Sequence, residues 1–409
     1  MLKCFSPWTI LLSLSVAGCH PVPATTTTDD DGTAATTDSP TASTTTTDEP
    51  TTGSPDTATT STDSPATTDA ATTDATTTDA TTDAATTDED STSTGAPADC
   101  AVVEFADLDV EDQVRVALGS PVGPITGEQL ATLTFLFMDN ENTGPIEDLG
   151  GLECATALET LGVTGHATLK TDGIAAIAGL TQLTSLHLGS TAVDDLAVVA
   201  NLTKLKHLNL HGAPVSDLSP LAGLVELQYL DASATAIADV SALAGLVALE
   251  DLLLQQVQVT DLSPLQGLGS LVALDIAGTA VIDLGPLAGL SKLRFLRAAN
   301  TAVSDVSPLA DLPLESLDLA ECEVVDISPL ASLPTPGSLV LRSNHIVEVD
   351  ALLDAGWFVM DDGCGGLDLR DNPLSLAAKQ DVLALCEATQ LLVETDDGTC
   401  GGTPACIMP

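Results

Sequence analysis

The stretch that decides the fold is residues 205–226, LKHLNLHGAPVSDLSPLAGLVE, and residues 249–270, LEDLLLQQVQVTDLSPLQGLGS, repeat its apolar positions. The leucine that opens such a segment recurs every 22 residues from Leu183 to Leu293, and Leu314 follows 21 residues later. Self-similarity at a period of about 20–50 residues is the signature of a solenoid. We therefore expect each segment to form one turn of a repeating coil.

The spacing of the apolar residues predicts the local structure of each segment. Within residues 205–226 the apolar positions are separated by 3, 2, 5, 3, 3 and 3 residues. The gap of 2 is typical of a strand, and gaps of 3 are typical of a 3₁₀-helix. Each segment is thus predicted to be a short strand and a tight helical return leg. Successive strands should stack into a parallel sheet, with the apolar residues forming one continuous core.

The return leg carries its own motif, DLSPL at residues 217–221, which recurs at 261–265 and, as DVSPL, at 305–309. Serine followed by proline predicts a serine N-cap with proline at the first helical position. The aspartate is expected to accept backbone N–H groups at this turn, and calcium binding is the less favoured alternative. The aspartate column comprises Asp195, Asp217, Asp239, Asp261, Asp283, Asp305 and Asp326.

The full pattern, Leu-x-x-Leu-x-Leu-x-x-(Asn/Thr)-x-(Val/Ile)-x-Asp-Leu-x-Pro-Leu-x-x-Leu, resembles the 22-residue leucine-rich repeat of bacterial internalins over roughly residues 100–375. The resemblance implies an α/β leucine-rich-repeat solenoid, or horseshoe. It also implies a parallel β-sheet on the concave face, 3₁₀ turns on the convex face, and a helical cap at each end. The family's asparagine column is mostly threonine here, which predicts a weaker hydrogen-bond ladder. This column holds Thr191, Thr235, Thr279 and Thr301, whereas Asn344 and Asn372 keep the family residue.

The N-terminus predicts export and anchoring. Residues 1–18 have a basic start and a short apolar run, as a secretory signal does. The sequence Val-Ala-Gly-Cys at residues 16–19 resembles the bacterial lipobox, which implies cleavage before Cys19 and a lipid on its sulfur. An ordinary signal peptide with a chance cysteine is the alternative. We expect an extracytoplasmic protein of the bacterial cell envelope, anchored at the outer membrane or cell surface.

Residues 19–99 are expected to form a disordered tether. The tract 20–98 holds 15 acidic residues, no Lys or Arg, and no apolar periodicity. Outside the tract and the signal segment, 44 acidic and 10 basic residues remain, a net charge of −34. Such a charge argues against nucleic acid or anionic lipid as the main partner.

Both ends of the solenoid are predicted to be capped. We expect an N-terminal helical cap over residues 100–132, repeats over 133–363, and a C-terminal cap over 364–409 with a helix at 375–392. Cysteines gather at the caps, which suits an oxidising compartment, although connectivity cannot be deduced from spacing. We favour Cys100–Cys154, Cys364–Cys386 and Cys400–Cys406 as disulfides over zinc at the C-terminal four, and Cys322 as a buried free thiol.

Function is expected on the concave face. Counting the opening leucine as position 1, side chains at positions 2, 3, 5, 7 and 8 form columns across strands about 4.8 Å apart. Five of the 10 basic residues that follow the signal segment fall there, with three of the six histidines and the only tyrosine. A rigid scaffold with one varied face is a binding surface by default. The candidate ligand-binding residues are His187, Lys206, His207, His211, Tyr229, Asp231, Leu253, Arg294, Phe295, Arg297 and Arg342.

Other interpretations of this face stay open. Arg297 lies between Asp275 and Asp318, and Arg294 lies beside Glu315, so ion-pair ladders would explain these arginines equally well. Tyr229, Phe295 and Leu253 are expected to be exposed apolar groups and favour binding. A metal held by three histidines and an aspartate is the less favoured choice; the residues concerned are His187, His207, His211 and Asp231.

No catalytic motif accompanies these residues: GxSxG, HExxH, a P-loop and a dinucleotide fingerprint are all missing from the sequence. We expect no enzyme, no cofactor, no metal and no nucleic acid. The predicted function is a lipid-anchored, surface-displayed monomer that binds a protein, or as second choice a glycan, through its concave face. The alternative is a structural or adhesive envelope spacer without a discrete ligand, in which calcium binds the aspartate column.

Overall fold

The computed structural model describes residues 100–334, 336–353, 355, 366–389 and 392–400. These residues belong to one compact unit. The predicted signal segment, Cys19 and the tether lie outside the described residues. No helix among the described residues is long and apolar enough to cross a bilayer.

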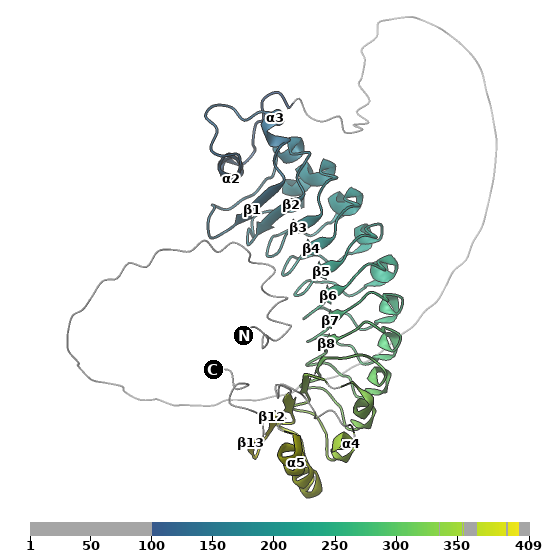
Figure 1. The fold of residues 1–409 in the computed structure, drawn as a ribbon. Coiled ribbons are helices and arrows are strands. Elements are labelled where there is room, and N and C mark those ends of the chain that lie inside the picture. The colour runs from purple at the N-terminus through teal and green to yellow at the C-terminus, as the bar shows by residue number, and fades with distance from the viewer. Residues whose placement is uncertain (1–99, 335, 354, 356–365, 390–391, 401–409) are drawn as a thin grey trace, which may run out of the picture. The chain divides into compact units, whose positions relative to one another are not determined.

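One sheet of 13 strands, in chain order, runs along the whole unit. Neighbouring strands are parallel from β1 to β12, and only β12 and β13 are antiparallel. The prediction of stacked short strands is confirmed (Figure 1). The strands are β1 (Phe135–Asp139), β2 (Thr160–Thr164), β3 (Ser185–His187), β4 (His207–Asn209), β5 (Tyr229–Asp231), β6 (Asp251–Leu253), β7 (Ala273–Asp275), β8 (Phe295–Arg297), β9 (Ser316–Asp318), β10 (Ser338–Val340), β11 (Gly366–Asp368), β12 (Leu392–Thr395) and β13 (Gly398–Cys400).

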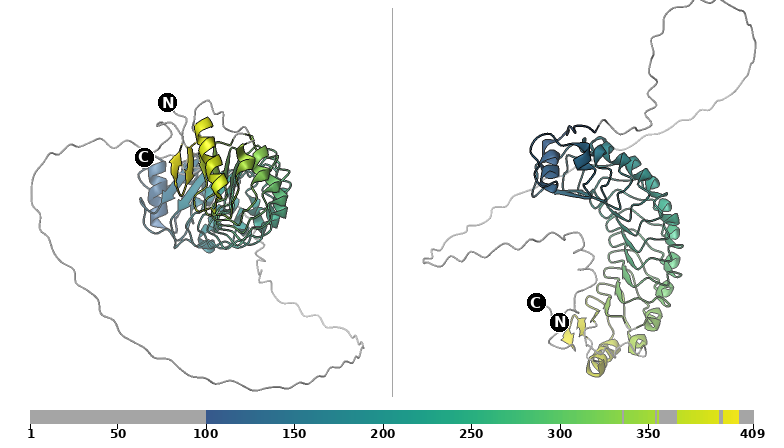
Figure 2. Two further views of the ribbon diagram at one scale, coloured as in Figure 1. Left: turned by 90° about the horizontal axis from the view of Figure 1, so that it is seen from below. Right: turned by 45° about the horizontal axis from the view of Figure 1, so that its top comes forward.

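The return legs are 3₁₀-helices, as the gaps of 3 predict. They lie on the outside of the curve while the sheet lines the inside (Figures 1 and 2). The repeats therefore form the expected horseshoe, with a concave sheet. The legs are η1 (Leu152–Cys154), η2 (Thr171–Gly179), η3 (Ala197–Asn201), η4 (Ser219–Leu221), η5 (Ser241–Gly245), η6 (Ser263–Leu265), η7 (Gly285–Leu287), η8 (Ser307–Leu309) and η9 (Ser328–Ser332).

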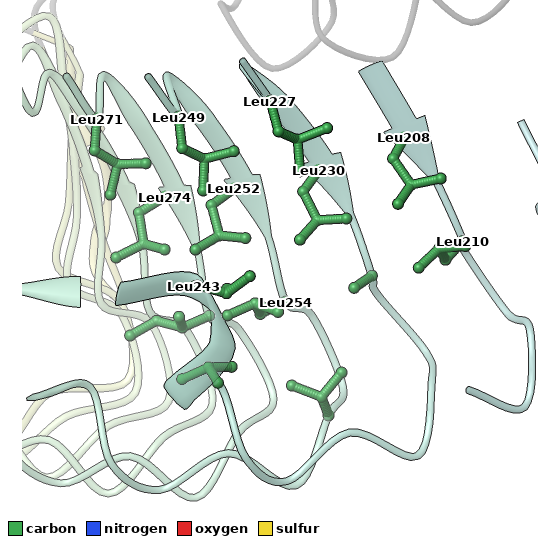
Figure 3. Packing of buried hydrophobic residues seen from close by; sticks show 14 of the residues in the cluster. Leu208, Leu210, Leu227, Leu230, Leu243, Leu249, Leu252, Leu254, Leu271 and Leu274 are labelled. Carbon is green, nitrogen blue, oxygen red and sulfur yellow. The ribbon is translucent and has the colours of Figure 1, made fainter. Parts of the chain in front are cut away.

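The strand leucines at positions 4 and 6 point into the core. Leu208, Leu230, Leu252 and Leu274 are fully buried and lie in line under successive strands (Figure 3). Each buried leucine contributes about 1.5–3 kcal/mol of hydrophobic stabilisation. Because strand side chains alternate, positions 3 and 5 must point to the concave side.

A left-handed residue at position 8 ends each strand segment. Its φ is between 55° and 58° in seven non-glycine residues, although this region costs energy for residues with a Cβ. The repeat therefore requires this turn even where the sequence does not provide glycine. The seven are Ser190, Ala234, Gln256, Asn300, Glu321, Ser343 and Asp371.

The threonine column forms the weaker ladder that the sequence predicts. Thr191 donates its hydroxyl only to the carbonyl of Leu188, within its own turn. Asn344 instead donates to Leu319 O of the preceding repeat at 2.7 Å and accepts from Val324 N at 2.9 Å. Asn344 therefore joins two repeats, whereas Thr191 bonds within one; in the same column Thr301 reaches the next repeat only through a 3.3 Å contact with the Cys322 sulfur.

The serine N-cap prediction is wrong. Ser219 is the first residue of η4, and the preceding Leu218 makes no side-chain cap bond. Asp217 accepts both the Ser219 N–H and the Ser219 hydroxyl at 2.8 Å. These bonds, the backbone one first, lower the pKa of Asp217. The aspartate column thus caps the return legs.

The α-helices among the described residues lie toward the two ends of the solenoid, and α4 falls within the range predicted for the repeats. The N-terminal helices are α2 (Leu108–Ala117) and α3 (Gly127–Leu130), and Thr126 forms a capping box with Gln129. At the other end lie α4 (Asp350–Leu353) and α5 (Leu376–Thr389), and residue 392 begins β12 rather than ending the predicted helix.

The predicted Cys100–Cys154 disulfide is formed, with 5.9 Å between the Cα atoms. Cys322 is a buried free thiol, as expected. The other two predicted pairs, Cys364–Cys386 and Cys400–Cys406, depend on side chains outside the described set, and so does the zinc alternative.

Candidate functional site

The concave face is made of columns that follow the sheet register. At position 5 the register runs from His187 through Asn209, Asp231, Leu253 and Asp275 to Arg297. At position 3 a parallel column runs through His207, Tyr229, Asp251, Ala273 and Phe295 on the same strands. Lys206 and Arg294 directly precede their strands, and His211 and Arg342 follow theirs by two residues. All eleven candidate residues therefore lie along one sheet.

The candidate ligand-binding residues differ in how far their side chains are exposed to solvent. Tyr229, Phe295 and Arg297 are half-buried, while His207 and Arg294 are exposed. Leu253 is only 8% exposed, so the expectation of an exposed leucine is wrong. Asp231, its partner in the register, is also 8% exposed. Burial in a sheet depends on neighbouring side chains, which a column of sequence positions does not describe.

An aromatic cluster begins the concave face. The rings of Phe135 and Phe137 are nearly parallel, with 6.5 Å between centroids, and Phe137 meets His187 edge-on at 5.9 Å. Gly162 lies between Phe137 and His187 in the register. A Cβ on Gly162 would lie 2.1 Å from Cδ2 of Phe137, so the ring occupies the space that a larger residue would fill.

Sequence reasoning missed Phe135 and Phe137. The columns were followed only from Leu183 onward, where the 22-residue period begins. Leu133 and Leu158 precede Leu183 at intervals of 25 residues, so the same leucine spacing continues with a longer loop. Reading positions 3 and 5 from Leu133 would have found both phenylalanines.

The aromatic surface continues over the next strands. His207 and Tyr229, partners in the register, have ring centroids 6.4 Å apart. Burial lowers the pKa of His187, and the nearby His207 lowers it further. The pKa of His207 is also lowered, first by burial and then by the charge of Lys206. Both imidazoles are therefore neutral at pH 7. We call this surface the aromatic ridge; it comprises Phe135, Phe137, His187, His207 and Tyr229.

Beyond the ridge the face becomes acidic. Asp251 is the register partner of Tyr229 and follows the exposed Glu250. Burial first, and Glu250 second, raise the pKa of Asp251 to about 6. Burial, followed by Asp231 and Asp251, raises the pKa of Tyr229. From β1 to β6, a continuous stretch that the structure describes, no carboxylate forms an ion pair.

The concave arginines of the C-terminal half are all paired. Arg297 lies 3.4 Å from Asp275 (Nη1 to Oδ2) and 3.3 Å from Asp318 (Nε to Oδ2). Arg294 pairs with Glu315. The other two concave arginines also form ion pairs. Arg342 contacts Glu321 at 3.3 Å. Arg370 contacts Asp368 and, at 2.9 Å, Glu394.

Asp275 is the most buried member of these pairs, with 0% exposure. Its Oδ1 accepts the N–H of Ala277, and its Oδ2 accepts from Gln255 and Arg297. Burial raises the pKa of Asp275 to about 6, because its effect is larger than the opposite effect of these three partners, which lower the pKa. The ladder interpretation of Arg297 thus has a structural basis.

Among the described residues, no three His, Cys, Asp or Glu side chains come together as metal ligands. His187 instead forms a 3.0 Å hydrogen bond with Ser185, through Nε2 and the hydroxyl. The aspartate column is engaged in capping, as at Asp217. Neither group forms a cation cage.

Solved structures of known proteins share this fold. An internalin, InlF, from Listeria monocytogenes is 27% identical, with a TM-score of 0.60, over 72% of this chain and 91% of that one. The chain is an internalin-like leucine-rich-repeat protein. The plant peptide hormone receptor RGFR1, in complex with RGF2, shares the fold at 17% identity and a TM-score of 0.50, over 61% of this chain and 45% of that chain. No protein-family model and no curated protein sequence matches this internalin-like chain.

Proposed function

We propose that this internalin-like protein is a lipid-anchored, surface-displayed module that binds a protein partner through its concave face. The aromatic ridge is the contact centre, flanked by Lys206 and His211. Cys19 supplies the anchor to a bacterial envelope membrane, and residues 19–99 supply the reach. The anchor and the tether rest on the sequence alone.

The observation that carries the proposal is the concentration of aromatic side chains on the ridge. Only nine aromatic residues occur in 409, yet three of them lie within a span of five neighbouring strands on one face: Phe135 and Phe137 on β1 and Tyr229 on β5. Phe135 is 58% exposed and its ring lies beside that of Phe137, so the two rings form one apolar patch on the concave face. Aromatic anchors dominate protein–protein binding energies. The RGFR1 complex adds support at the level of fold alone.

The paired arginines have a supporting role in this proposal. Arg294, Arg297 and Arg342 already neutralise carboxylates of adjacent strands. Leu253 and Asp231 are too buried to contribute much contact area. Phe295 remains a peripheral contact of the same column as Tyr229.

The test is partner capture by the immobilised full chain, with captured proteins identified and their Kd remeasured with purified components. The triple variant Phe135→Ala, Phe137→Ala, Tyr229→Ala should lose at least about 100-fold in affinity, since each anchor contributes about 2 kcal/mol or more. The matched control is Val225→Ala, Val247→Ala, Ile282→Ala, which removes exposed apolar surface outside the concave columns. Unchanged capture by the first triple variant would refute the proposal.

A structural spacer is the competing function, and light scattering of the full chain distinguishes it. The binding module should remain monomeric with or without calcium. Calcium-dependent self-association through the aspartate column would favour the spacer.

A further inference from the structure

The carboxylates of the concave face differ in what neutralises them. At positions 2, 3 and 5 of the described strands from β7 to β12, each carboxylate pairs with an arginine; the residues are Asp275, Glu315, Asp318, Asp368 and Glu394. On β5, on β6 and just before β6, Asp231, Glu250 and Asp251 have no cationic partner among the described residues. Asp231 accepts only from Ser233 N and Asn209.

The register shows where a cation is missing. Along position 5, β7 to β9 place Arg297 between Asp275 and Asp318. Two strands earlier, β5 to β7 place Leu253 between Asp231 and Asp275. Both groups of three strands have an aspartate on each outer strand. The middle strand carries Arg297 in one group and Leu253 in the other.

These carboxylates adjoin the aromatic ridge at its last ring. Tyr229 lies directly across from Asp251, and its pKa responds to both Asp231 and Asp251. An aromatic face beside carboxylates attracts a cation through the ring quadrupole as well as through charge. Burial, and secondarily Glu250, raises the pKa of Asp251, and a cation beside this half-buried carboxylate would favour its ionised form.

We propose, building on the function proposed above, that the protein partner presents a basic side chain, arginine or lysine, to Tyr229, Glu250 and Asp251, while an apolar side chain of the same segment packs on Phe135 and Phe137. The partner's cation neutralises Glu250 and Asp251, as Arg297 neutralises Asp275 and Asp318 within the chain. Charge complementarity selects this occupant, because an acidic or neutral segment would leave Glu250 and Asp251 without a cation.

The spacing of the two ends sets the size of the segment. The distance from β1 to β6 covers five strand intervals, which is roughly 24 Å at about 4.8 Å each. An extended chain advances about 3.3 Å per residue, so the basic and apolar side chains should be about seven residues apart.

The experiment uses two synthetic peptides and ligand-observed NMR titration with the full chain. The first peptide carries a leucine and an arginine separated by six serine and threonine residues, and the second has citrulline in place of arginine. We expect the arginine peptide to bind at least fivefold more tightly than the citrulline peptide. Equal affinities, or no binding of either peptide at millimolar concentration, would overturn the proposal.

Variants locate the arginine preference. Glu250→Gln with Asp251→Asn should abolish it, and Leu253→Arg, which supplies an internal cation, should do the same. The charge-matched control is Asp239→Asn with Asp261→Asn, which changes exposed aspartates of the capping column, where asparagine can still accept the Ser241 and Ser263 N–H groups. If this control lost the preference equally, the long-range field of the acidic chain would explain it and the local site would be refuted.

The experiments distinguish a failure of the basic-side-chain proposal from a failure of the proposed binding function. Phe135→Ala with Phe137→Ala should weaken both peptides and leave their affinity ratio unchanged. If the triple aromatic variant loses partner capture but the peptides show no arginine preference, only the basic side chain is refuted. If the preference exists but the triple variant still captures its partner, the proposed function is refuted and the basic-residue site stands alone.

Discussion

The two halves of the concave sheet share one backbone and one register but use their outward positions differently. From β7 to β12, the arginines and carboxylates of adjacent strands neutralise one another. From β1 to β6, the same positions hold rings and unpaired carboxylates. A repeating scaffold therefore fixes where a side chain points, while the side chain's neighbours decide whether it stabilises the coil or remains available to a partner.

The difference also reflects the charge of the chain. With a net charge of −48, carboxylates in adjacent strands repel unless a cation separates them. The C-terminal half uses its few arginines for this purpose. From β1 to β4 the N-terminal half instead holds mostly aromatic, histidine and uncharged polar side chains, whereas Asp231, Glu250 and Asp251 at β5 and β6 have no cation among the described residues.

The largest effect on stability should come from Arg297→Ala in the C-terminal half. Its loss leaves Asp275, which is fully buried, without a cation. Breaking a buried pair costs about 3–5 kcal/mol, and we expect the lower end because Arg297 itself is 39% exposed. Because the pKa of Asp275 is about 6, the cost should be larger at pH 8, where the carboxylate is ionised, than at pH 5. Urea unfolding at the two pH values measures the difference.

The control is the double variant Arg297→Ala, Asp275→Asn, which removes both charges. It should recover most of the stability lost at pH 8, since an amide needs no counter-ion. A pH-independent loss in the single variant would show that packing of the arginine side chain, and not its charge, stabilises this half.

The second effect concerns Gly162, on which the ridge depends. In Gly162→Ala the new Cβ would collide with the ring of Phe137, and such overpacking costs about 1–2 kcal/mol. The displaced ring should also weaken partner binding. Thermal unfolding and partner affinity measure the two consequences.

The effect of Gly162→Ala should change sign when the ring of Phe137 has first been removed. In Phe137→Ala, where the ring is gone, Gly162→Ala should be neutral or stabilising by about 0.5–1 kcal/mol, because alanine is favoured over glycine inside a strand. A cost that persists in this background would mean that the strand backbone, and not the ring, requires glycine.

The contrast between the halves was only partly predictable from sequence. The fixed period placed His187, Asp231 and Arg297 in one column correctly, because a register follows from repeat length alone. Phe135 was missed because the first repeats are 25 residues long. The burial of Leu253 depends on rotamers of adjacent strands, which no linear pattern encodes. Whether Arg297 binds a ligand or pairs with Asp275 and Asp318 depends on the direction of its side chain, which the sequence does not give.

A smaller effect separates ionised from neutral carboxylates in the N-terminal half. The pKa of Asp251 is raised to about 6 in the fold, above its unfolded value. Its contribution to stability is therefore fully present below about pH 4 and is lost as the pH rises through about 6. Asp251→Asn should stabilise the protein at pH 8, by about 1 kcal/mol or less since the group is partly solvated, and should be neutral at pH 4. Chemical denaturation at both pH values tests this, and an equal effect at both would contradict the assignment.

The smallest effect should come from Arg294→Ala, the exposed counterpart of Arg297→Ala. Arg294 and Glu315 are 54% and 45% exposed, so water solvates each charge when the other is removed. Exposed pairs contribute about 0.2–1 kcal/mol, less at high salt, and we expect a loss of about 0.5 kcal/mol that disappears in 1 M NaCl. The Arg297→Ala loss should persist in that salt, because Asp275 is shielded from solvent ions. If both arginines cost the same, burial of the carboxylate would not be what distinguishes the ladder at β7–β9 from an ordinary surface pair, and the C-terminal half would owe its stability to its leucine core alone.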